Sequence, residues 1–115
     1  MFSGMATATQ MELELAVRAV LAHVRAEAIL LFGSQAREES HSGSDMDLLI
    51  VAGKDALGGV PGYEVLGRIY RELSVLPMGV DLLLYTPEEV EARRNSLNHV
   101  IAHALREGRF LYGRI

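Results

Sequence analysis

Apolar residues recur along the chain at two spacings, which predict helices in some segments and strands in others. A spacing of three and four residues predicts a first helix, whose apolar face consists of Leu13, Ala16, Val17, Val20, Leu21 and Val24. The same spacing predicts a second helix, with Leu66, Ile69, Tyr70 and Leu73 on its apolar face. A last helix is expected to carry Leu97, Val100, Ile101, Ala104 and Leu105.

Two polar patterns indicate where helices begin. Thr9 is followed three residues later by Glu12, and Thr86 by Glu89, which is the spacing of a capping box. Pro87 occupies the first helical position of the second pattern, where the missing N–H of proline costs nothing. We therefore expect helices to begin directly after Thr9 and Thr86.

Short apolar runs without the helical spacing predict buried strands. They span residues 28–32, 46–52 and 80–86, and "RFLY" at 109–112 is a candidate for a short fourth strand. The order of elements predicts an α/β (α+β) fold, a small mixed three- to four-stranded sheet with helices packed on it. A length of 115 residues suffices for one core, so we expect a single domain, 1–115.

Composition excludes several classes of function. The net charge of −4 argues against a domain whose main task is to bind nucleic-acid backbone, and no direct nucleic-acid binding is expected. The longest apolar runs are far shorter than the roughly 20 residues of a membrane span, and the start lacks the pattern of a secretory signal. The absence of cysteine excludes disulfides and thiolate metal sites. A cytoplasmic location is the default expectation.

Three aspartates and a Gly-Ser pair are expected to meet at one end of the sheet. Asp45 and Asp47 are two residues apart at the start of the second strand, so their side chains project to the same face. Gly33 and Ser34 follow the first strand, which brings them to the same end if the first two strands are antiparallel. Asp81 begins the third strand, reached through a crossover helix of the kind that joins parallel neighbours.

Such a cluster suits the binding of metal and phosphate. Three adjacent carboxylates repel one another, and a divalent cation removes that cost. Oxygen ligands favour Mg²⁺ or Mn²⁺, and a pair of such ions can stabilise the attacking and the leaving oxygen of a phosphoryl displacement. Taken alone, the Gly-Ser pair is most simply a turn, the two aspartates a solvated loop, and Asp81 the start of a strand. The three together indicate a binding site more specifically than any one of them. An EF-hand from Asp45 is excluded by Ile50 and Ala56, and a P-loop by the lack of a lysine after Gly33.

The string "FGSQAR…SDMDLLIV", with Asp81 on a later strand, resembles the nucleotidyltransferase superfamily of DNA polymerase beta. The short length and the fuller motif resemble its minimal nucleotidyltransferase (MNT) branch, over about residues 28–85. Glu38 departs from that pattern, because the family often has glycine after the arginine. The resemblance implies transfer of AMP from ATP, with two Mg²⁺ or Mn²⁺ ions and release of pyrophosphate.

The resemblance also implies a role for each motif residue. Asp45, Asp47 and Asp81 would be the metal ligands, and Asp81 would in addition accept the proton of the acceptor hydroxyl. The nucleotide-binding residues implied by the motif are Gly33, Ser34, Arg37 and Ser44. For Arg37, an ordinary surface arginine is an equally good interpretation.

Three functions remain open at this point. The MNT branch implies an antitoxin that adenylylates a tyrosine of a HEPN toxin partner. A binding module that neutralises a partner by contact is the second, and an aminoglycoside-type small-molecule adenylyltransferase is the third. The acidic triad favours catalysis over contact alone, and the short chain argues against the third function, because such enzymes usually carry an additional helical domain.

The histidines offer weaker candidates. His41 lies in the loop before Asp45, where a solvated side chain is the simpler interpretation. His99 and His103 have the spacing of a zinc pair on a helix, but the glutamate of the zinc motif is missing. We interpret these two as helix surface or interface, and His23 as structural.

Overall fold

The four strands form one mixed sheet in the order β3-β2-β1-β4. The computed structural model describes residues 8–33 and 45–115. Within them the strands are β1 (Ala28–Phe32), β2 (Met46–Val51), β3 (Val80–Tyr85) and β4 (Arg109–Gly113). β1 pairs antiparallel with β2 and β4, whereas β2 and β3 are parallel. The mixed sheet was expected from the sequence, and the structure confirms it. The antiparallel pairing of β1 and β2 fulfils the condition under which Gly33 and Asp47 lie at the same end of the sheet, and the candidate fourth strand forms as β4.

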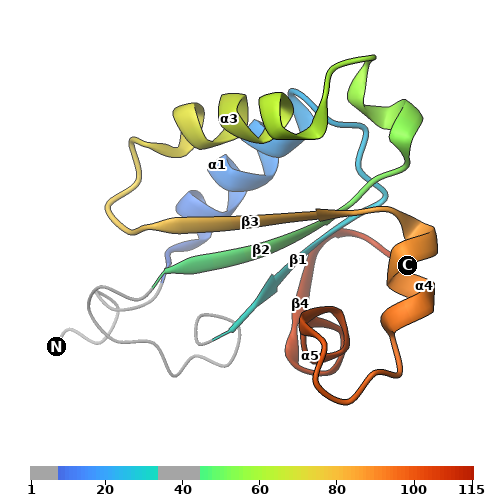
Figure 1. Cartoon of the computed structure of the whole chain (residues 1–115). Coiled ribbons are helices and arrows are strands. Elements are labelled where there is room, and N and C mark those ends of the chain that lie inside the picture. Colours follow the sequence, from blue (N-terminus) through green and yellow to red (C-terminus); the bar gives the residue numbers. More distant parts are fainter. Residues whose placement is uncertain (1–7, 34–44) are drawn as a thin grey trace, which may run out of the picture.

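Helices lie on both faces of this sheet (Figure 1). They are α1 (Gln10–Leu21), α3 (Gly62–Leu73), α4 (Pro87–Arg93) and α5 (Val100–Glu107), with a 3₁₀ turn, η2 (Lys54–Leu57), that the pattern did not predict. Both expected capping boxes form, since the side chains of Thr9 and Thr86 accept hydrogen bonds from the amides of Glu12 and Glu89, each at 3.1 Å. Among the described residues, no helix is both long and apolar enough to cross a membrane.

The alternation of side chains along the strands creates two separate cores. On one face α1 and α3 pack over a cluster that includes Met46, Leu48 and Ile50 of β2. On the other face α4 and α5 pack over a smaller cluster that includes Leu49 and Val51. Asp47 alternates with the first set, so it belongs to the face of α4 and α5.

The first helix pair is joined to the sheet by polar contacts as well as by its apolar stripe. The Tyr70 hydroxyl on α3 accepts a hydrogen bond from the amide of Leu82 at 2.8 Å, on the outer edge of β3. His23, after α1, pairs with Glu72 of α3, which agrees with the structural role expected for this histidine. These contacts tie α1 to α3 and α3 to the edge of the sheet.

The last helix begins later than the sequence pattern suggested. Leu97, expected on its apolar face, is 80% exposed and lies before the helix. His99 is the N-cap residue, and its Nδ1 accepts a hydrogen bond from the amide of Ile101 at 3.1 Å. A histidine is not one of the usual capping residues, which is why the pattern placed the start too early.

Candidate active site

Asp47 and Asp81 lie opposite each other on the parallel pair β2 and β3, where they are register partners. Asp45 precedes β2 by one residue, and its charge acts on the Asp47 carboxyl. Asp47 is half-buried, whereas Asp45 and Asp81 are exposed. The structure therefore brings the three carboxylates together at the beginning of β2 and β3, on the left in Figure 1. Their roles in metal binding and catalysis stay predictions.

The turn after β1 lies against this cluster. Gly33 has a φ of +76°, a backbone conformation that residues with a side chain rarely adopt. A Cβ atom added at Gly33 would collide with Oδ2 of Asp47. The preceding residue, Phe32, is the register partner of Asp47 on β2. The backbone of the turn and the central carboxylate are thus in direct contact, and glycine is required there on two grounds.

A second glycine, Gly79, holds the same relation to Asp45, and sequence reasoning missed it. A Cβ atom at Gly79 would lie 2.5 Å from Oδ1 of Asp45. The carbonyl oxygen of Gly79 also accepts a hydrogen bond at 2.8 Å from the amide of Met46, the residue between Asp45 and Asp47. The only signal in the sequence was a glycine two residues before Asp81, which is common before any strand.

The cluster is electrostatically strained at its centre. The pKa of the Asp47 carboxyl is raised from 3.8 to about 6, mainly by burial and in addition by the charges of Asp81 and Asp45 and by a hydrogen bond with Asp81. A carboxylate whose charge is disfavoured in this way gains most from a cation or a proton placed beside it. The arrangement is therefore suited to cation binding.

The three carboxylates suit an open site for a magnesium-type ion better than a site in which protein ligands surround the metal completely. All three side chains offer hard oxygen ligands, and two of them are exposed. Across residues 8–33 and 45–115, no three His, Asp or Glu side chains already surround one point as metal ligands. Mg²⁺ typically takes one or two carboxylates and completes its shell with water and substrate phosphate, so an open cluster suffices.

Several residues singled out in the sequence lie outside the described residues. They are Ser34, Arg37, Ser44 and His41, and their predicted roles stay predictions.

The two remaining histidines do not form a zinc pair. His99 uses Nδ1 to cap α5 and packs edge-on against the ring of Tyr85, with centroids 6.1 Å apart. Nδ1 of His103 lies 3.0 Å from Nη2 of Arg106 on the next turn. Both imidazoles interact with groups of α5, which agrees with their interpretation as helix surface.

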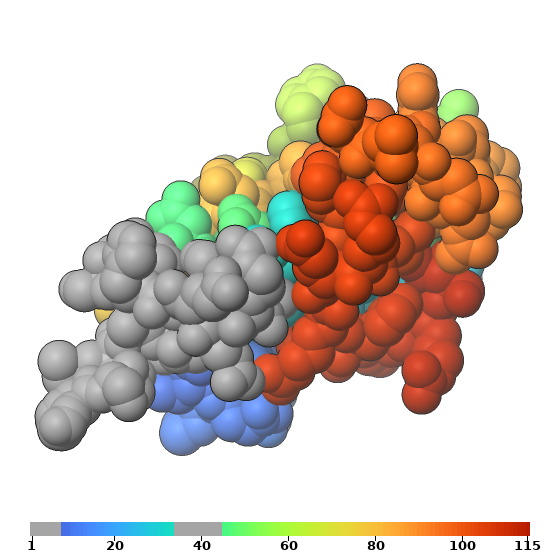
Figure 2. Space-filling view, turned by 90° about the horizontal axis from the view of Figure 1, so that it is seen from below, coloured from blue at the N-terminus to red at the C-terminus, as the bar shows by residue number. Residues whose placement is uncertain are grey.

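A hollow opens beside the acidic cluster, on the face of α4 and α5. It has a volume of about 340 Å³ and is lined by Phe32, Gly33, Asn98, Val100, His103 and Glu107. In Figure 2, cyan atoms from the end of β1 come to the surface next to the orange-red α5, with green atoms of β2 on their other side. This β1–α5 pocket shares Gly33 with the candidate site.

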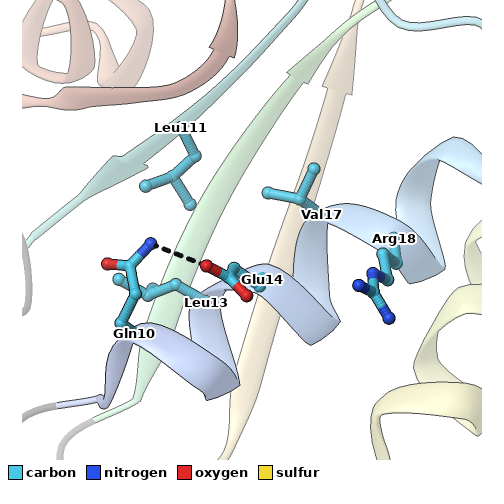
Figure 3. Close-up of a pocket in the computed structure, with 6 residues that line it drawn as sticks. All are labelled: Gln10, Leu13, Glu14, Val17, Arg18 and Leu111. Atoms are coloured by element: carbon cyan, nitrogen blue, oxygen red, sulfur yellow. Dashed lines mark hydrogen bonds between the residues drawn. The ribbon is translucent and has the colours of Figure 1, made fainter.

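Another hollow lies away from the carboxylates, between α1 and β4 (Figure 3). Its volume is about 230 Å³, and Leu13, Val17 and Leu111 supply its apolar wall. The Gln10 amide donates a hydrogen bond to Glu14 at 3.3 Å across its rim. Of the candidate site residues that the structure describes, Gly33, Asp45, Asp47 and Asp81, none lines it.

The sequence decides the family. Residues 13–103 match the family model for the nucleotidyltransferase domain, a span that contains Gly33 and all three carboxylates. The chain belongs to the nucleotidyltransferase domain family. A search among curated proteins finds no match.

Three solved structures share the fold of this nucleotidyltransferase domain. A toxin-antitoxin structure with AMP-PNP has a TM-score of 0.59 at 20% identity, covering 89% of this chain and 73% of its own. The toxin-antitoxin MntA-HpeT, in a variant with two aspartates changed to glutamate, has a TM-score of 0.62 at 18% identity, with the same coverage of 89% and 73%. A Sulfolobus solfataricus protein assigned as a nucleotidyltransferase has a TM-score of 0.54 at 19% identity, covering 90% of this chain and 82% of its own. At these identities the likeness establishes the fold alone.

Proposed function

We propose that this nucleotidyltransferase is an antitoxin of the minimal type, which transfers AMP from ATP to a tyrosine hydroxyl of a HEPN toxin partner and releases pyrophosphate. The observation that carries the proposal is the register pairing of Asp47 with Asp81, with the backbone of Gly33 packed against Asp47. A protein that acted by contact alone would gain nothing from carboxylates that repel one another at a single point.

Two Mg²⁺ or Mn²⁺ ions are the cofactors that this donor set supports. Asp45, Asp47 and Asp81 would hold them, and their positive charge would offset the burial and the repulsion that raise the pKa of Asp47. When bound, such ions neutralise the triphosphate and stabilise the attacking and leaving oxygens of the displacement.

The chain's own groups would position the nucleotide and remove one proton. Gly33 and Ser34 would hold the triphosphate, with Arg37 and Ser44 as further phosphate contacts. In the transfer, a bond forms between the acceptor oxygen and the α-phosphorus while the bond from that phosphorus to pyrophosphate breaks. The proton of the hydroxyl passes to Asp81, which is exposed at the start of β3 and so accessible to an incoming acceptor.

A protein side chain is the acceptor that this surface supports best. Two of the three carboxylates are exposed, so the site opens outward from the sheet. Docking of a partner would supply the positioning that a closed pocket otherwise provides. A tyrosine hydroxyl, with an unperturbed pKa of about 10, loses its proton more easily than an aliphatic alcohol. The toxin-antitoxin complexes among the structural neighbours support a toxin as that partner.

The test uses ATP labelled on the α-phosphate, Mg²⁺ and the protein that copurifies with the tagged chain. We expect label on a tyrosine of that partner, identified by mass spectrometry, and no label with the double variant Asp45→Asn, Asp47→Asn. Asp55→Asn is the matched control, because Asp55 is an exposed aspartate in η2, beyond the other end of β2.

Each contrary outcome points to a different function. Transfer that survives in the double variant would overturn the site. A wild-type protein that inhibits its partner without labelling it would favour neutralisation by contact. Label on an added aminoglycoside instead of the partner would favour a small-molecule adenylyltransferase.

A further inference from the structure

The β1–α5 pocket lies directly beside the candidate site. Phe32 and Gly33 form one of its walls, and these two residues are the register partner of Asp47 and the turn packed against its carboxylate. Asp47 and Phe32 both belong to the face of the sheet that α4 and α5 cover. A nucleotide with its phosphates at Gly33 would therefore have this pocket within reach of its other end.

The opposite wall of the pocket is fixed in place before any ligand binds. Val100 packs against the second core cluster, in which Ile101 and Ala104 anchor α5 to Leu30 of β1. The start of α5 is held by the His99 cap and by the edge-on contact of that imidazole with a tyrosine of β3. A wall that is held at the helix start and along its buried face is preorganised, which lowers the cost of binding.

The size and the lining of the pocket suit a heteroaromatic ring. A volume of about 340 Å³ lies at the small end of the range of roughly 300–1,000 Å³ for small-molecule sites, enough for part of a nucleotide. Phe32 and Val100 are half-buried apolar walls, and the exposed Asn98 and His103 add polar groups at the rim. Phe32 offers an aromatic face on which a base can stack.

The polar rim distinguishes a base from the ring of a tyrosine acceptor. The one polar atom of a tyrosine must lie at the carboxylates, so the remainder of its ring requires only apolar surroundings. A nucleobase carries hydrogen-bonding groups along its edge and gains from polar partners there. The amide of Asn98 presents a donor beside an acceptor, which complements the adjacent donor and acceptor on the edge of adenine.

We propose that the β1–α5 pocket binds the nucleobase of the nucleoside triphosphate, and that Asn98 selects adenine through its side-chain amide. This inference rests on the proposed function for the triphosphate end of the ligand, and it assigns the other end. It makes α5 a specificity element of the enzyme as well as a cover for the second core.

The experiment compares ATP with inorganic triphosphate, which has the same phosphates and no base. Val100→Trp fills the pocket, and Leu97→Trp is the matched control, since Leu97 is 80% exposed and does not line the pocket. By calorimetry with Mg²⁺ present, we expect Val100→Trp to lower the affinity for ATP at least tenfold and to change the affinity for triphosphate less than twofold. Leu97→Trp should leave both affinities at wild-type values.

A milder variant guards against misfolding of Val100→Trp. Asn98 is exposed in the turn before the His99 cap, so Asn98→Ala removes the amide without touching the core. We expect Asn98→Ala to lower the affinity for ATP about tenfold and to reduce the preference for ATP over GTP, in line with the loss of one bidentate base contact.

Two results would overturn the inference. The first is that Asn98→Ala and folded Val100→Trp keep the wild-type affinity for ATP and the wild-type preference for ATP over GTP. The second is that these variants lose affinity for triphosphate by the same factor as for ATP. Continued AMP transfer in that case would leave the proposed function standing with the base placed elsewhere. A wild-type protein that binds ATP through this pocket and transfers nothing would keep the inference and remove the transfer.

Discussion

The two faces of the sheet use the same strands for different purposes. On the face of α1 and α3, Met46, Leu48 and Ile50 of β2 are fully buried, and helices cover the strand from its first residue. On the face of α4 and α5, Leu49 and Val51 are buried, but Asp47 replaces an apolar residue. One face thus stabilises the fold, and the other gives up part of its core to hold charge where a ligand can reach it.

The largest effect is expected on the open face, where Asp81→Asn should reduce AMP transfer at least 1,000-fold. The change removes a carboxylate paired in register with Asp47 but no apolar contact, so the free energy of unfolding should change little. A loss of that size corresponds to about 4 kcal/mol of transition-state stabilisation. Single-turnover transfer and urea unfolding measured on the same preparation check both parts, and a loss of activity that simply follows a loss of stability would contradict the contrast.

On the covered face the opposite pattern is expected from Ile69→Ala. Ile69 of α3 is fully buried against the first core cluster, so the substitution leaves a cavity and should lower the free energy of unfolding by about 3 kcal/mol. Under conditions where the variant is still folded, its affinity for ATP should be that of the wild type. Urea denaturation with parallel calorimetry measures both, and weakened ATP binding by folded Ile69→Ala would show that the two faces are coupled.

A smaller difference between the two faces is expected in the pH dependence of stability, to which Asp47 on the open face should contribute. The pKa of Asp47 is raised from 3.8 to about 6 in the folded protein, so the folded state binds a proton that the unfolded chain releases. Stability contributed by the protonated carboxyl is complete below pH 3.8 and is lost as the pH rises through 6. Asp47→Asn should therefore stabilise the protein at pH 7, by on the order of 1 kcal/mol after screening by solvent, and much less at pH 4.5.

Urea unfolding without divalent ions, at pH 4.5 and 7, measures this difference for Asp47→Asn against wild type. An equal effect at both values of pH would mean that Asp47 carries no strained charge.

The smallest effect concerns the edge of the sheet, where Tyr70 of α3 accepts a hydrogen bond from the amide of Leu82. Tyr70→Phe should cost about 1 kcal/mol, the net worth of one such bond. Tyr63→Phe is the control, because Tyr63 is 80% exposed on the same helix. Thermal unfolding compares the two, and equal midpoints would remove the edge contact from the account.

Much of the candidate site followed from the sequence, because it depends on local rules. The period of two along a strand put Asp45 and Asp47 on the same face, and a crossover helix before Asp81 indicated a parallel neighbour. These rules determine which ends of the strands meet, and that was enough to bring the carboxylates together. The two capping boxes were likewise legible, since each is contained in four residues.

The parts that the sequence did not reveal depend on contacts between distant segments. Gly79 is needed only because the carboxylate of Asp45 occupies the space of its missing side chain. The β1–α5 pocket forms where Asn98 and Val100 meet the end of β1, some 65 residues earlier. The start of α5 was misplaced because His99 takes over the capping role that serine, threonine or aspartate usually performs.

The central claim, that Asp47 lies at the centre of a metal and nucleotide site, is tested most directly by Mn²⁺ binding with a non-hydrolysable ATP analogue. Electron paramagnetic resonance counts the free ion as protein is added, for wild type, Asp47→Asn and Asp55→Asn. We expect wild type and Asp55→Asn to bind Mn²⁺ with equal affinity, and Asp47→Asn to bind it at least tenfold more weakly. Equal affinity of Asp47→Asn and Asp55→Asn would contradict the claim.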